Sequence, residues 1–495
     1  RKPLRQRGGQ WDKWRVPEQD RANALLQEGI ERAKSGDIEE ALRMFDQALE
    51  VVPKNPVVNY NRGLAQQQAG SIEAAVVAYR AATEIQPQFT EAWINLSQAL
   101  KLLGRFSQAL EAAEQAVQLN PAEPSAWLAK GNALRGTHAL GQAVDAYRRG
   151  VEVAPADGQL KVSLANTTRE LGQVPEAIRL LREAVEEHPG FAEAHRDLAH
   201  ALLLNGDYRE GWAENRWRWG TESLCNAKRH QAIPEWKGEP LTGKQILLWD
   251  EQGFGDAIQF VRFVPWVAEM GAEVVLEVQP QLVRLFGTVA AADQVIPRGG
   301  AMPRVDYQAS LLDLGGVFCS EPMSIPNETP YIRVESETKP ATANRLRVGL
   351  CWAGNPSHDN DRNRSMAFET LRPLLELPRI DFINLQLGRE ADEAFAETEF
   401  KESLGNPVDF YETARLVATL DLVITIDSSI AHLTGALGQP VWVLLPHGPD
   451  WRWMLGRDDS SWYPGARLFR QAEPGDWSAP IREIRQKIVN FPTRK

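Results

Sequence analysis

The chain has few cysteines and no excess of positive charge. Its 495 residues include only Cys225, Cys319 and Cys351, which are too widely spaced, and odd in number, for a disulfide framework or a zinc site. Sparse, unpaired cysteines are typical of a reducing compartment, so we expect a cytoplasmic protein. The formal net charge of −11 disfavours a nucleic-acid or membrane-surface role, because both need a basic face.

Long apolar runs are also missing. No stretch reaches the length that spans a bilayer. Residues 1–21 are basic but lack the apolar segment of a signal peptide, so we expect them to be a disordered lead-in. The expected partner is therefore a protein or a small molecule, with no nucleic acid and no membrane insertion.

The strongest pattern that is present is a period of 34 residues. It is kept by prolines and alanines: Pro53, Pro87, Pro121, Pro155 and Pro189, and Ala41, Ala75, Ala109, Ala143 and Ala177. This period is typical of stacked helix-turn-helix repeats, and recurring glycine and aromatic positions fit the tetratricopeptide pattern. We predict five repeats over residues 22–191 and a degenerate sixth that ends near Trp219. The fold expected for residues 22–219 is an α-solenoid, a TPR superhelix.

The pattern changes after residue 219. Residues 220–243 are rich in proline, glycine and polar residues, which predicts a linker. Short apolar runs then alternate with helical stretches in two successive sets, over residues 244–340 and 341–495. This alternation predicts two Rossmann-like α/β halves facing a cleft, with ligands at the carboxyl ends of their strands.

The first loop at such a strand end carries the sequence EQGFGDAIQF. Gly253 and Gly255 allow close approach of the backbone, and Asp256 opens the next helix with its carboxylate toward the cleft. A helix-capping role for Asp256 is an equal alternative. The two glycines also begin a dinucleotide-binding G-x-G-x-x-G with Glu277 as the ribose acid, but Ile258 replaces the third glycine and weighs against that alternative.

The second loop, AGNPSHDNDRNRSM, follows the strand that ends at Trp352. Asn355, Ser357 and Arg364 are residue types that hold phosphate oxygens by hydrogen bonds and positive charge. The segment Asp359-Asn360-Asp361 looks like the D-x-D that binds a divalent metal in some sugar transferases. A polar surface loop explains three residues better, so we predict no metal.

The third loop has the sequence TIDSSIAHLTGALGQP. Asp427, Ser428 and Ser429 occupy a strand-to-helix turn, where backbone N–H groups and the helix dipole form an anion site suited to a pyrophosphate. His432 lies one helical turn beyond Ser428; the alternative for it is a buried structural histidine. The loop LPHGPDWRW comes after the next strand. It would line the cleft, or its tryptophans would have a packing role alone.

These motifs resemble those of a known family. GFGDAIQFVRFVPWV, GLCWAGNPSHDNDRNRSM and DSSIAHLTGALGQP are similar to motifs of bacterial tetratricopeptide-repeat glycosyltransferases related to heptosyltransferases. The repeat-plus-transferase layout is similar to that of O-linked N-acetylglucosamine transferase. The resemblance implies a GT-B fold and an inverting, metal-independent transfer from a nucleotide sugar, with no cofactor. Heptosyltransferases usually have a lysine in the second loop where this chain has Arg364, so the donor need not be ADP-heptose.

The resemblance also implies roles for individual residues. Asp256 matches the residue proposed as the base for the acceptor hydroxyl, and Arg364 would meet the leaving phosphate. The residues expected to bind the donor are Gly253, Gly255, Asn355, Ser357, Asp427, Ser428, Ser429 and His432.

Asn61 and Asn95 share one repeat position on the first helix of their repeats, which lines the concave face of such a stack. A side-chain amide can pair with the backbone of an extended peptide, as an asparagine ladder does in the related N-acetylglucosamine transferase. The other repeats have Gln27, Ala129 and Ser163 at this position, and a role in solubility is an equal explanation.

The acceptor that the resemblance implies is Ser or Thr of a protein recruited by the repeats, for example a flagellin or another surface protein. Two alternatives stay open. One is an enzyme with a glycan or lipopolysaccharide acceptor. The other is a non-catalytic repeat scaffold whose transferase-like half binds a nucleotide or a partner without turnover.

Overall fold

The computed structural model describes residues 18–251, 253–335, 345–358, 360–388, 400–405 and 407–492. The predicted lead-in lies outside the described residues as far as residue 17, and the first helix begins at Glu18. The chain divides into two compact units at Thr167/Thr168. We call them the repeat unit, which ends at Thr167, and the composite unit, which begins at Thr168. The sequence placed the main boundary in the linker 220–243, some fifty residues further along.

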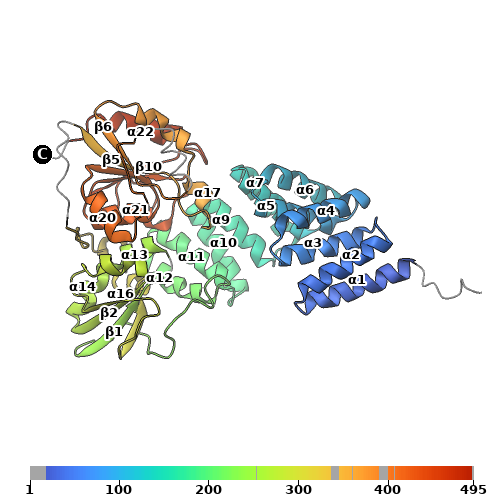
Figure 1. The fold of residues 1–495 in the computed structure, drawn as a ribbon, viewed down its shortest axis with the longest axis horizontal. Helices are drawn as coiled ribbons and strands as arrows, with labels where there is room; N and C mark the ends of the chain where they lie inside the picture. The colour runs from blue at the N-terminus through green and yellow to red at the C-terminus, as the bar shows by residue number, and fades with distance from the viewer. Residues whose placement is uncertain are drawn as a thin grey trace, which may run out of the picture. The chain divides into compact units, whose positions relative to one another are not determined.

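The repeat unit is built from pairs of helices (Figure 1). They are α1 (Glu18–Lys34), α2 (Ile38–Val51), α3 (Pro56–Gln68), α4 (Ile72–Ile85), α5 (Thr90–Leu102), α6 (Phe106–Leu119), α7 (Pro124–Gly136), α8 (Leu140–Val153) and most of α9 (Gly158–Glu170). Within a pair, an aromatic ring packs on a glycine. A Cβ on Gly63 would lie 2.6 Å from the ring of Tyr79, and one on Gly131 would lie 2.3 Å from that of Tyr147. The glycine is therefore what allows the ring between the helices.

Two further features recur with the 34-residue period, a backbone conformation and a hydrogen bond. The turn between paired helices has a left-handed residue, with φ between 71° and 96° at five glycines: Gly36, Gly70, Gly104, Gly172 and Gly206. The indole nitrogens of Trp93 and Trp127 each donate to the carbonyl oxygen of the proline six residues earlier, at 2.9 Å. His195 occupies the same position in the sixth repeat and its Nε2 lies 3.1 Å from the carbonyl oxygen of Pro189.

The composite unit begins with the remaining repeat helices and continues into two α/β halves. Its helices are α10 (Val174–Glu187), α11 (Ala192–Asn205), α12 (Tyr208–Asn215), α13 (Phe254–Phe260), α14 (Val264–Glu269), α15 (Val283–Phe286), α16 (Asp313–Phe318), α17 (Asp361–Arg364), α18 (Arg372–Leu375), α20 (Phe410–Ala418), α21 (Ser429–Ala436) and α22 (Ser478–Ile488). The 3-10 helices used below are η1 (Arg216–Gly220) and η6 (Trp451–Trp453).

Both sheets are parallel throughout their described strands. The first contains β1 (Lys244–Trp249), β2 (Ala272–Val278), β3 (Gln294–Pro297) and β4 (Tyr307–Ser310) in the order β3-β2-β1-β4. The second contains β5 (Leu346–Cys351), β6 (Ile380–Asn384), β7 (Glu402–Ser403), β8 (Leu422–Ile426), β9 (Val441–Leu445) and β10 (Ala466–Arg470) in the order β10-β9-β8-β5-β6-β7. The switch in strand order between β5 and β8 is typical of doubly wound sheets. The prediction of two parallel α/β halves is confirmed.

The last repeat helices pack directly on these halves (Figure 1). The ring of Trp212, on α12, lies 5.9 Å from Phe260 of the first half and 5.4 Å from Trp451 of the second, both edge-on. A Cβ on Gly315 of α16 would lie 2.4 Å from the Trp212 ring. This packing explains why the compact unit begins before the linker.

The predicted linker is itself packed against the first sheet. Trp236 is 2% exposed and Leu241 fully buried. The backbone of Gln308 on β4 exchanges hydrogen bonds with Trp236 and Pro234, so this segment lies along the sheet edge. Residues 220–243 thus contribute to the core of the first half.

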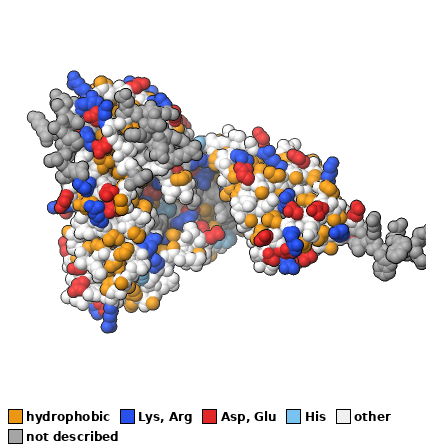
Figure 2. Space-filling view, in the orientation of Figure 1, with side chains coloured by type: hydrophobic (Ala, Val, Ile, Leu, Met, Phe, Trp, Pro, Cys, Tyr) orange, Lys and Arg blue, Asp and Glu red, His pale blue; other side chains and the backbone are white. Residues whose placement is uncertain are grey.

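The described surface shows charges of both signs. In Figure 2, Lys and Arg side chains are interspersed with Asp and Glu over the face that is drawn. None of the described helices is long and apolar enough to cross a membrane.

Candidate functional site

The second sheet has a switch point at the carboxyl ends of β5 and β8. These strands are neighbours, and the connections from them lead to opposite sides of the strand order. Ligands of doubly wound sheets bind in the crevice outside such a point. The loops that leave it are the second and third loops of the sequence analysis, so we take this edge as the candidate site.

The equivalent crevice of the first sheet, beyond β1 and β4, is filled by an arginine. Arg218 comes from η1 and is 2% exposed. Its guanidinium lies 3.1 Å from Glu251, which follows β1, and 2.8 Å from Asp313, which follows β4. Burial raises the pKa of Glu251 to about 7, against the opposing effect of Arg218. The repeat end thus closes the first switch point with a buried ion pair.

Glu277 at the end of β2 is also occupied by hydrogen bonds within the first half. It is 3% exposed and accepts hydrogen bonds from Arg229 and His230 of the linker, both at 2.7 Å, and from the backbone N–H of Gly299 at 3.2 Å. A ribose hydroxyl would have to displace these donors. The contacts of Glu277 therefore weigh against the dinucleotide alternative.

The third loop forms a helix start with available N–H groups. Ser428 precedes α21 with an extended backbone, and its side chain makes no capping bond. Its hydroxyl is instead 3.0 Å from that of Thr425. The first N–H groups of α21 therefore face the sheet edge without a capping bond from Ser428, and the helix dipole adds positive potential there.

His432 lies on α21 beside this turn and is buried. Its Nδ1 is 2.9 Å from the Tyr463 hydroxyl, its Nε2 is 4.0 Å from Asp427, and its ring stacks on Trp453. Burial, assisted by Arg452, lowers the pKa of His432 to about 3, so the imidazole is neutral at pH 7. Burial and the nearby carboxylate of Asp450 raise the pKa of Asp427 to about 6. His432 can serve here as a neutral hydrogen-bonding group.

Arg364 joins the second loop to the third. Its Nη1 donates to the backbone oxygen of Asp427 at 3.1 Å, and its Nε donates to Asp361 at 3.2 Å. A Cβ on Gly354 would lie 2.3 Å from Asp361 Oδ1 and 2.7 Å from Arg364 Nη2. Glycine at position 354 is therefore required for this pair to approach the loop.

The other predicted residues of the second loop lie on its exposed part. Asn355 Oδ1 accepts the backbone N–H of Ser357 at 3.0 Å, and both residues are exposed. No described hydrogen bond or ion pair joins either one to Arg364 or to the Asp427 turn. Of the D-x-D segment, Asp359 lies outside the described residues. In the described part of the chain, no group of three His, Cys, Asp or Glu side chains is arranged to hold a metal ion.

The first loop brings Asp256 to the same site from the other half. Asp256 lies in the first turn of α13, whose N-cap is Gly253, so Asp256 is not the capping residue. Its carboxylate pairs with Arg452 of η6. Arg452 also pairs with Asp450, at 2.9 Å. The candidate base is therefore held by a cation from the second half.

Gly255 brings α13 into direct contact with α21. A Cβ at this position would lie 2.9 Å from Cδ2 of His432 and 3.5 Å from Cα of Ser429. The two helices also make many close approaches along their lengths. A donor diphosphate would have to lie beside this contact, because no ligand atom fits between the two backbones.

The charge of the site is negative. Four carboxylates face two guanidiniums, a formal charge of −2 when all are ionised: Asp256, Asp361, Asp427 and Asp450 against Arg364 and Arg452. A diphosphate is favoured by the N–H groups of α21 and by Arg364, and is opposed by the carboxylates. The raised pKa of Asp427 reduces that opposition below about pH 6.

The predicted peptide-binding asparagines belong to the repeat unit. Nδ2 of Asn61 donates to the backbone oxygen of Val57 at 2.8 Å, and Nδ2 of Asn95 donates to the Tyr60 hydroxyl at 2.9 Å. Both side chains are half-buried, and their Oδ1 atoms have no hydrogen bond among the described residues. Each amide thus retains an acceptor for a backbone N–H.

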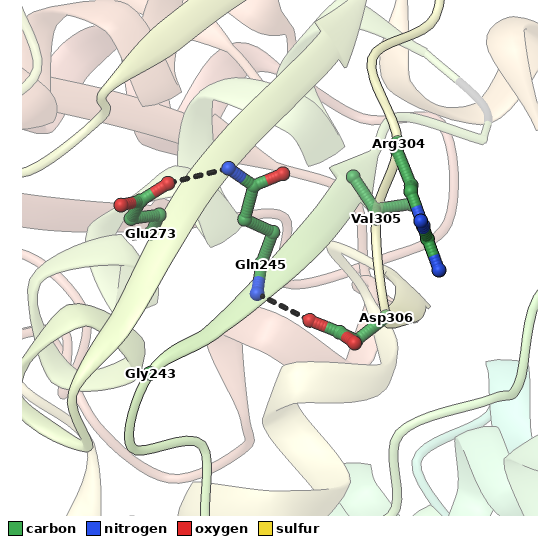
Figure 3. A pocket seen from close by; sticks show the side chains of 6 residues that line it. All are labelled: Gly243, Gln245, Glu273, Arg304, Val305 and Asp306. Carbon is green, nitrogen blue, oxygen red and sulfur yellow. Dashed lines mark hydrogen bonds between the residues drawn. The ribbon is translucent and has the colours of Figure 1, made fainter.

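A cavity of about 330 Å³ lies at the opposite edge of the first sheet. Figure 3 shows Gln245 between Glu273 and Asp306, with Arg304 at the side. The Gln245 amide donates to Glu273, and its backbone N–H donates to Asp306 at 2.9 Å. Gln245 and Glu273 stand at the amino ends of β1 and β2, and Asp306 immediately precedes β4, so this cavity is separate from the candidate site.

Three family models, each described as Tetratricopeptide repeat, match residues 26–88, 90–133 and 169–211. The N-terminal part carries tetratricopeptide repeats. Protein FlbA of Caulobacter vibrioides (strain ATCC 19089 / CIP 103742 / CB 15) is 27% identical over 327 residues, which are 59% of this chain and 54% of FlbA. The chain therefore spans about half the length of this curated relative.

Solved structures similar to this chain include TTC0263, a thermophilic TPR protein of Thermus thermophilus. It is 21% identical, with 37% of this chain and 99% of that chain covered and a TM-score of 0.32. YrrB, a TPR protein with an unusual peptide-binding site, is 20% identical, with 35% and 89% covered and a TM-score of 0.32.

Sequence reasoning missed the arginines that connect the parts around the TPR end. Arg218 and Arg452 make the contacts above, and Arg262 is 4% exposed and donates to the backbone oxygens of Pro326 and Trp462. The partners that these arginines reach in other parts of the fold are far away in the sequence. The available signal was the dense mixture of arginine and tryptophan in RWRWG and DWRW, and for DWRW the sequence analysis considered the tryptophans alone.

Proposed function

We propose that this protein is an inverting glycosyltransferase of GT-B architecture that moves a sugar from a nucleotide sugar to Ser or Thr of a protein held by the TPRs. The observation that carries the proposal is the contact of Gly255, the neighbour of Asp256, with the Asp427–His432 turn, from opposite α/β halves. The N–H groups at the start of α21 supply the anion-binding element that a diphosphate donor needs.

In this mechanism the donor diphosphate binds beside the α21 start. Asp256 takes the proton from the acceptor hydroxyl as that oxygen attacks the anomeric carbon, with inversion. The bond to the donor phosphate breaks at the same time, and negative charge grows on the leaving phosphate. Arg364 and the N–H groups of Ser428 and Ser429 stabilise that charge, so the proposal needs no metal.

The TPRs would hold the acceptor, since TPR solenoids present extended concave binding surfaces. Asn61 and Asn95 can accept peptide N–H groups through their Oδ1 atoms. The protein acceptor could be a flagellin or another surface protein, and a glycan acceptor is the alternative within the same chemistry. The protein would then act in the cytoplasm, where nucleotide sugars are available.

One observation favours a different function, a TPR scaffold without turnover. Asp256 is already paired with Arg452, and Gly255 closes the contact with α21. A site that stays in this state would bind a partner but would not transfer a sugar.

The two functions are separated by a donor screen followed by one variant. Purified protein is heated with ADP-, UDP-, GDP- and CMP-linked sugars, and the donor that raises the unfolding midpoint most is used to measure release of free sugar with and without EDTA. Asp256→Asn should lower turnover by about 10²–10⁴-fold and change donor affinity little, because a base acts in the transition state. Stabilisation by a donor without turnover favours the scaffold, and full turnover of the variant removes Asp256 from the mechanism. Activity lost in EDTA and restored by manganese contradicts the metal-free mechanism.

A further inference from the structure

Arg452 has an unusual set of contacts for an arginine outside the predicted site. Its side chain is 12% exposed and lies 4.4 Å above the Trp451 ring. Its guanidinium bonds to three acceptors: Asp256, Gln259 at 2.6 Å and Asp450 at 2.9 Å. Asp256 and Gln259 belong to α13 of the first half, whereas Arg452 and Asp450 belong to the second. One guanidinium therefore spans the two halves.

The contacts on α13 are specific in their geometry. Asp256 and Gln259 are three residues apart, so their side chains leave the same face of the helix. Arg452 Nη2 contacts Oδ1 of Asp256 while its Nε contacts Gln259. Oδ2 of Asp256 has no hydrogen bond among the described residues and lies 3.9 Å from where a Cβ on Gly253 would stand. The clamp thus fixes one carboxylate oxygen and leaves the other facing the glycine loop.

We propose that Arg452 is the positioning residue for Asp256, and that it orients the carboxylate only when the two halves are together. This inference rests on the proposed function, because it assigns how the candidate base is held. The guanidinium is itself fixed by its contacts with Gln259 and Asp450, so its hydrogen bond to Asp256 holds Oδ1 at one position. Asp450 in turn holds the guanidinium from its own loop, so the chain Asp450–Arg452–Asp256 joins the second half to the candidate base.

Arg452→Lys is the informative substitution, because lysine keeps the charge and loses the planar fork. Arg457 provides a matched control. It follows the same loop, is 28% exposed, and contacts Asp459 and Ser461 without reaching α13. The assay is release of free sugar from the nucleotide sugar selected by the thermal screen, with kcat and KM measured separately and the unfolding midpoint recorded for each variant.

We expect Arg452→Lys to lower kcat by about 10–100-fold, with the donor KM changed less than about threefold. Arg457→Lys should stay within about twofold in both. Because Arg452 acts through Asp256, Arg452→Lys should slow the Asp256→Asn variant by no more than about twofold. Asp450→Asn should reproduce part of the kcat loss of Arg452→Lys.

The outcomes separate this inference from the proposed function. Wild-type protein that turns over no donor overturns both. An active wild type with Arg452→Lys at the same rate overturns the positioning role alone. The positioning role is also overturned if Arg452→Lys raises the donor KM and leaves kcat unchanged. It is overturned as well if Arg452→Lys slows Asp256→Asn as much as it slows the wild type. In both cases Arg452 would act on the donor directly.

Discussion

The repeat unit and the composite unit are stabilised by contacts of different range. In the repeat unit, a ring on a glycine and a side-chain N–H on a proline oxygen recur every 34 residues, between partners close in sequence. In the composite unit the decisive contacts occur once, between residues far apart, such as Arg218 with Asp313 and Arg452 with Asp256. A change in the first unit should therefore remain local, whereas a change in the second should affect a whole interface.

Truncation should give the largest difference between the units. A chain that begins at residue 158 should keep a cooperative unfolding transition, because α10–α12 and η1 remain with both sheets. A chain that begins at residue 244 should fail to fold, because Phe260, Trp451 and Gly315 lose the ring of Trp212, and Glu251 and Asp313 lose Arg218. Tryptophan fluorescence during urea unfolding measures both. A cooperative transition of the shorter chain at an unchanged midpoint would show that the repeat end is dispensable.

The loss of an ion pair should also lower the free energy of unfolding more in the composite unit than in the repeat unit. Arg218→Leu should lower the free energy of unfolding by about 3–5 kcal/mol, because it leaves the buried carboxylate of Glu251 and the partly buried one of Asp313 without their cation. Arg105→Leu in the repeat unit should cost at most about 1 kcal/mol, because its pair with Glu73 is largely exposed. Urea titrations of the two variants give the comparison, and similar losses in both would contradict it.

Acid should destabilise the composite unit through His432. Its pKa is about 3 in the folded chain, below the ordinary 6.5, so its contribution to stability is complete above pH 6.5 and is lost as the pH falls toward 3. Between pH 6.5 and 5 the wild type should lose about 2 kcal/mol relative to His432→Gln. Asp427, with its pKa raised to about 6, works in the opposite direction between pH 6 and 4. Parallel curves for wild type and His432→Gln would show that the imidazole is not held neutral, and Asp427→Asn serves as the control of opposite sign.

The smallest effect is expected for a repeated contact. Trp127→Phe removes the indole N–H that donates to Pro121 and keeps most of the apolar ring, so it should cost about 0.5–1.5 kcal/mol. Trp93→Phe should behave alike because its contact is the same. Thermal unfolding monitored by circular dichroism is suitable, and a loss above about 3 kcal/mol in either variant would show that repeats are not independent.

The range of the contacts also explains what the sequence could predict. The 34-residue period predicted the helix pairs, because each repeat makes its main contacts within itself or with the next. Strands β1, β2, β3, β5, β6, β8 and β9 were predicted from apolar runs. Strand β4 was missed, because Tyr307–Ser310 is short and half polar, and its strand character comes from pairing with β1 and the linker.

The sequence predicted the strand-end loops that form the candidate site. It did not predict the arginine that connects the two halves there. Gly255, Asp256, Arg364 and the Asp427 turn lie together, as the rule for parallel sheets implies. Their roles in binding and catalysis stay predictions. Asn355 and Ser357 lie apart from them on an exposed turn, and Arg452 was not predicted, because its partners on α13 are about 195 residues away and no local pattern indicates such a pair.

The place of Trp212 between the two halves has a consequence for synthesis of the chain. The repeat unit leaves the ribosome first and can fold with partners that are already present. Trp212 is made 239 residues before Trp451. At translation rates of about 5–20 residues per second, its ring waits roughly 12–50 s for the second half of its pocket. During that interval the nascent chain presents an uncovered aromatic surface, so α12 is the segment that a chaperone would most usefully shield.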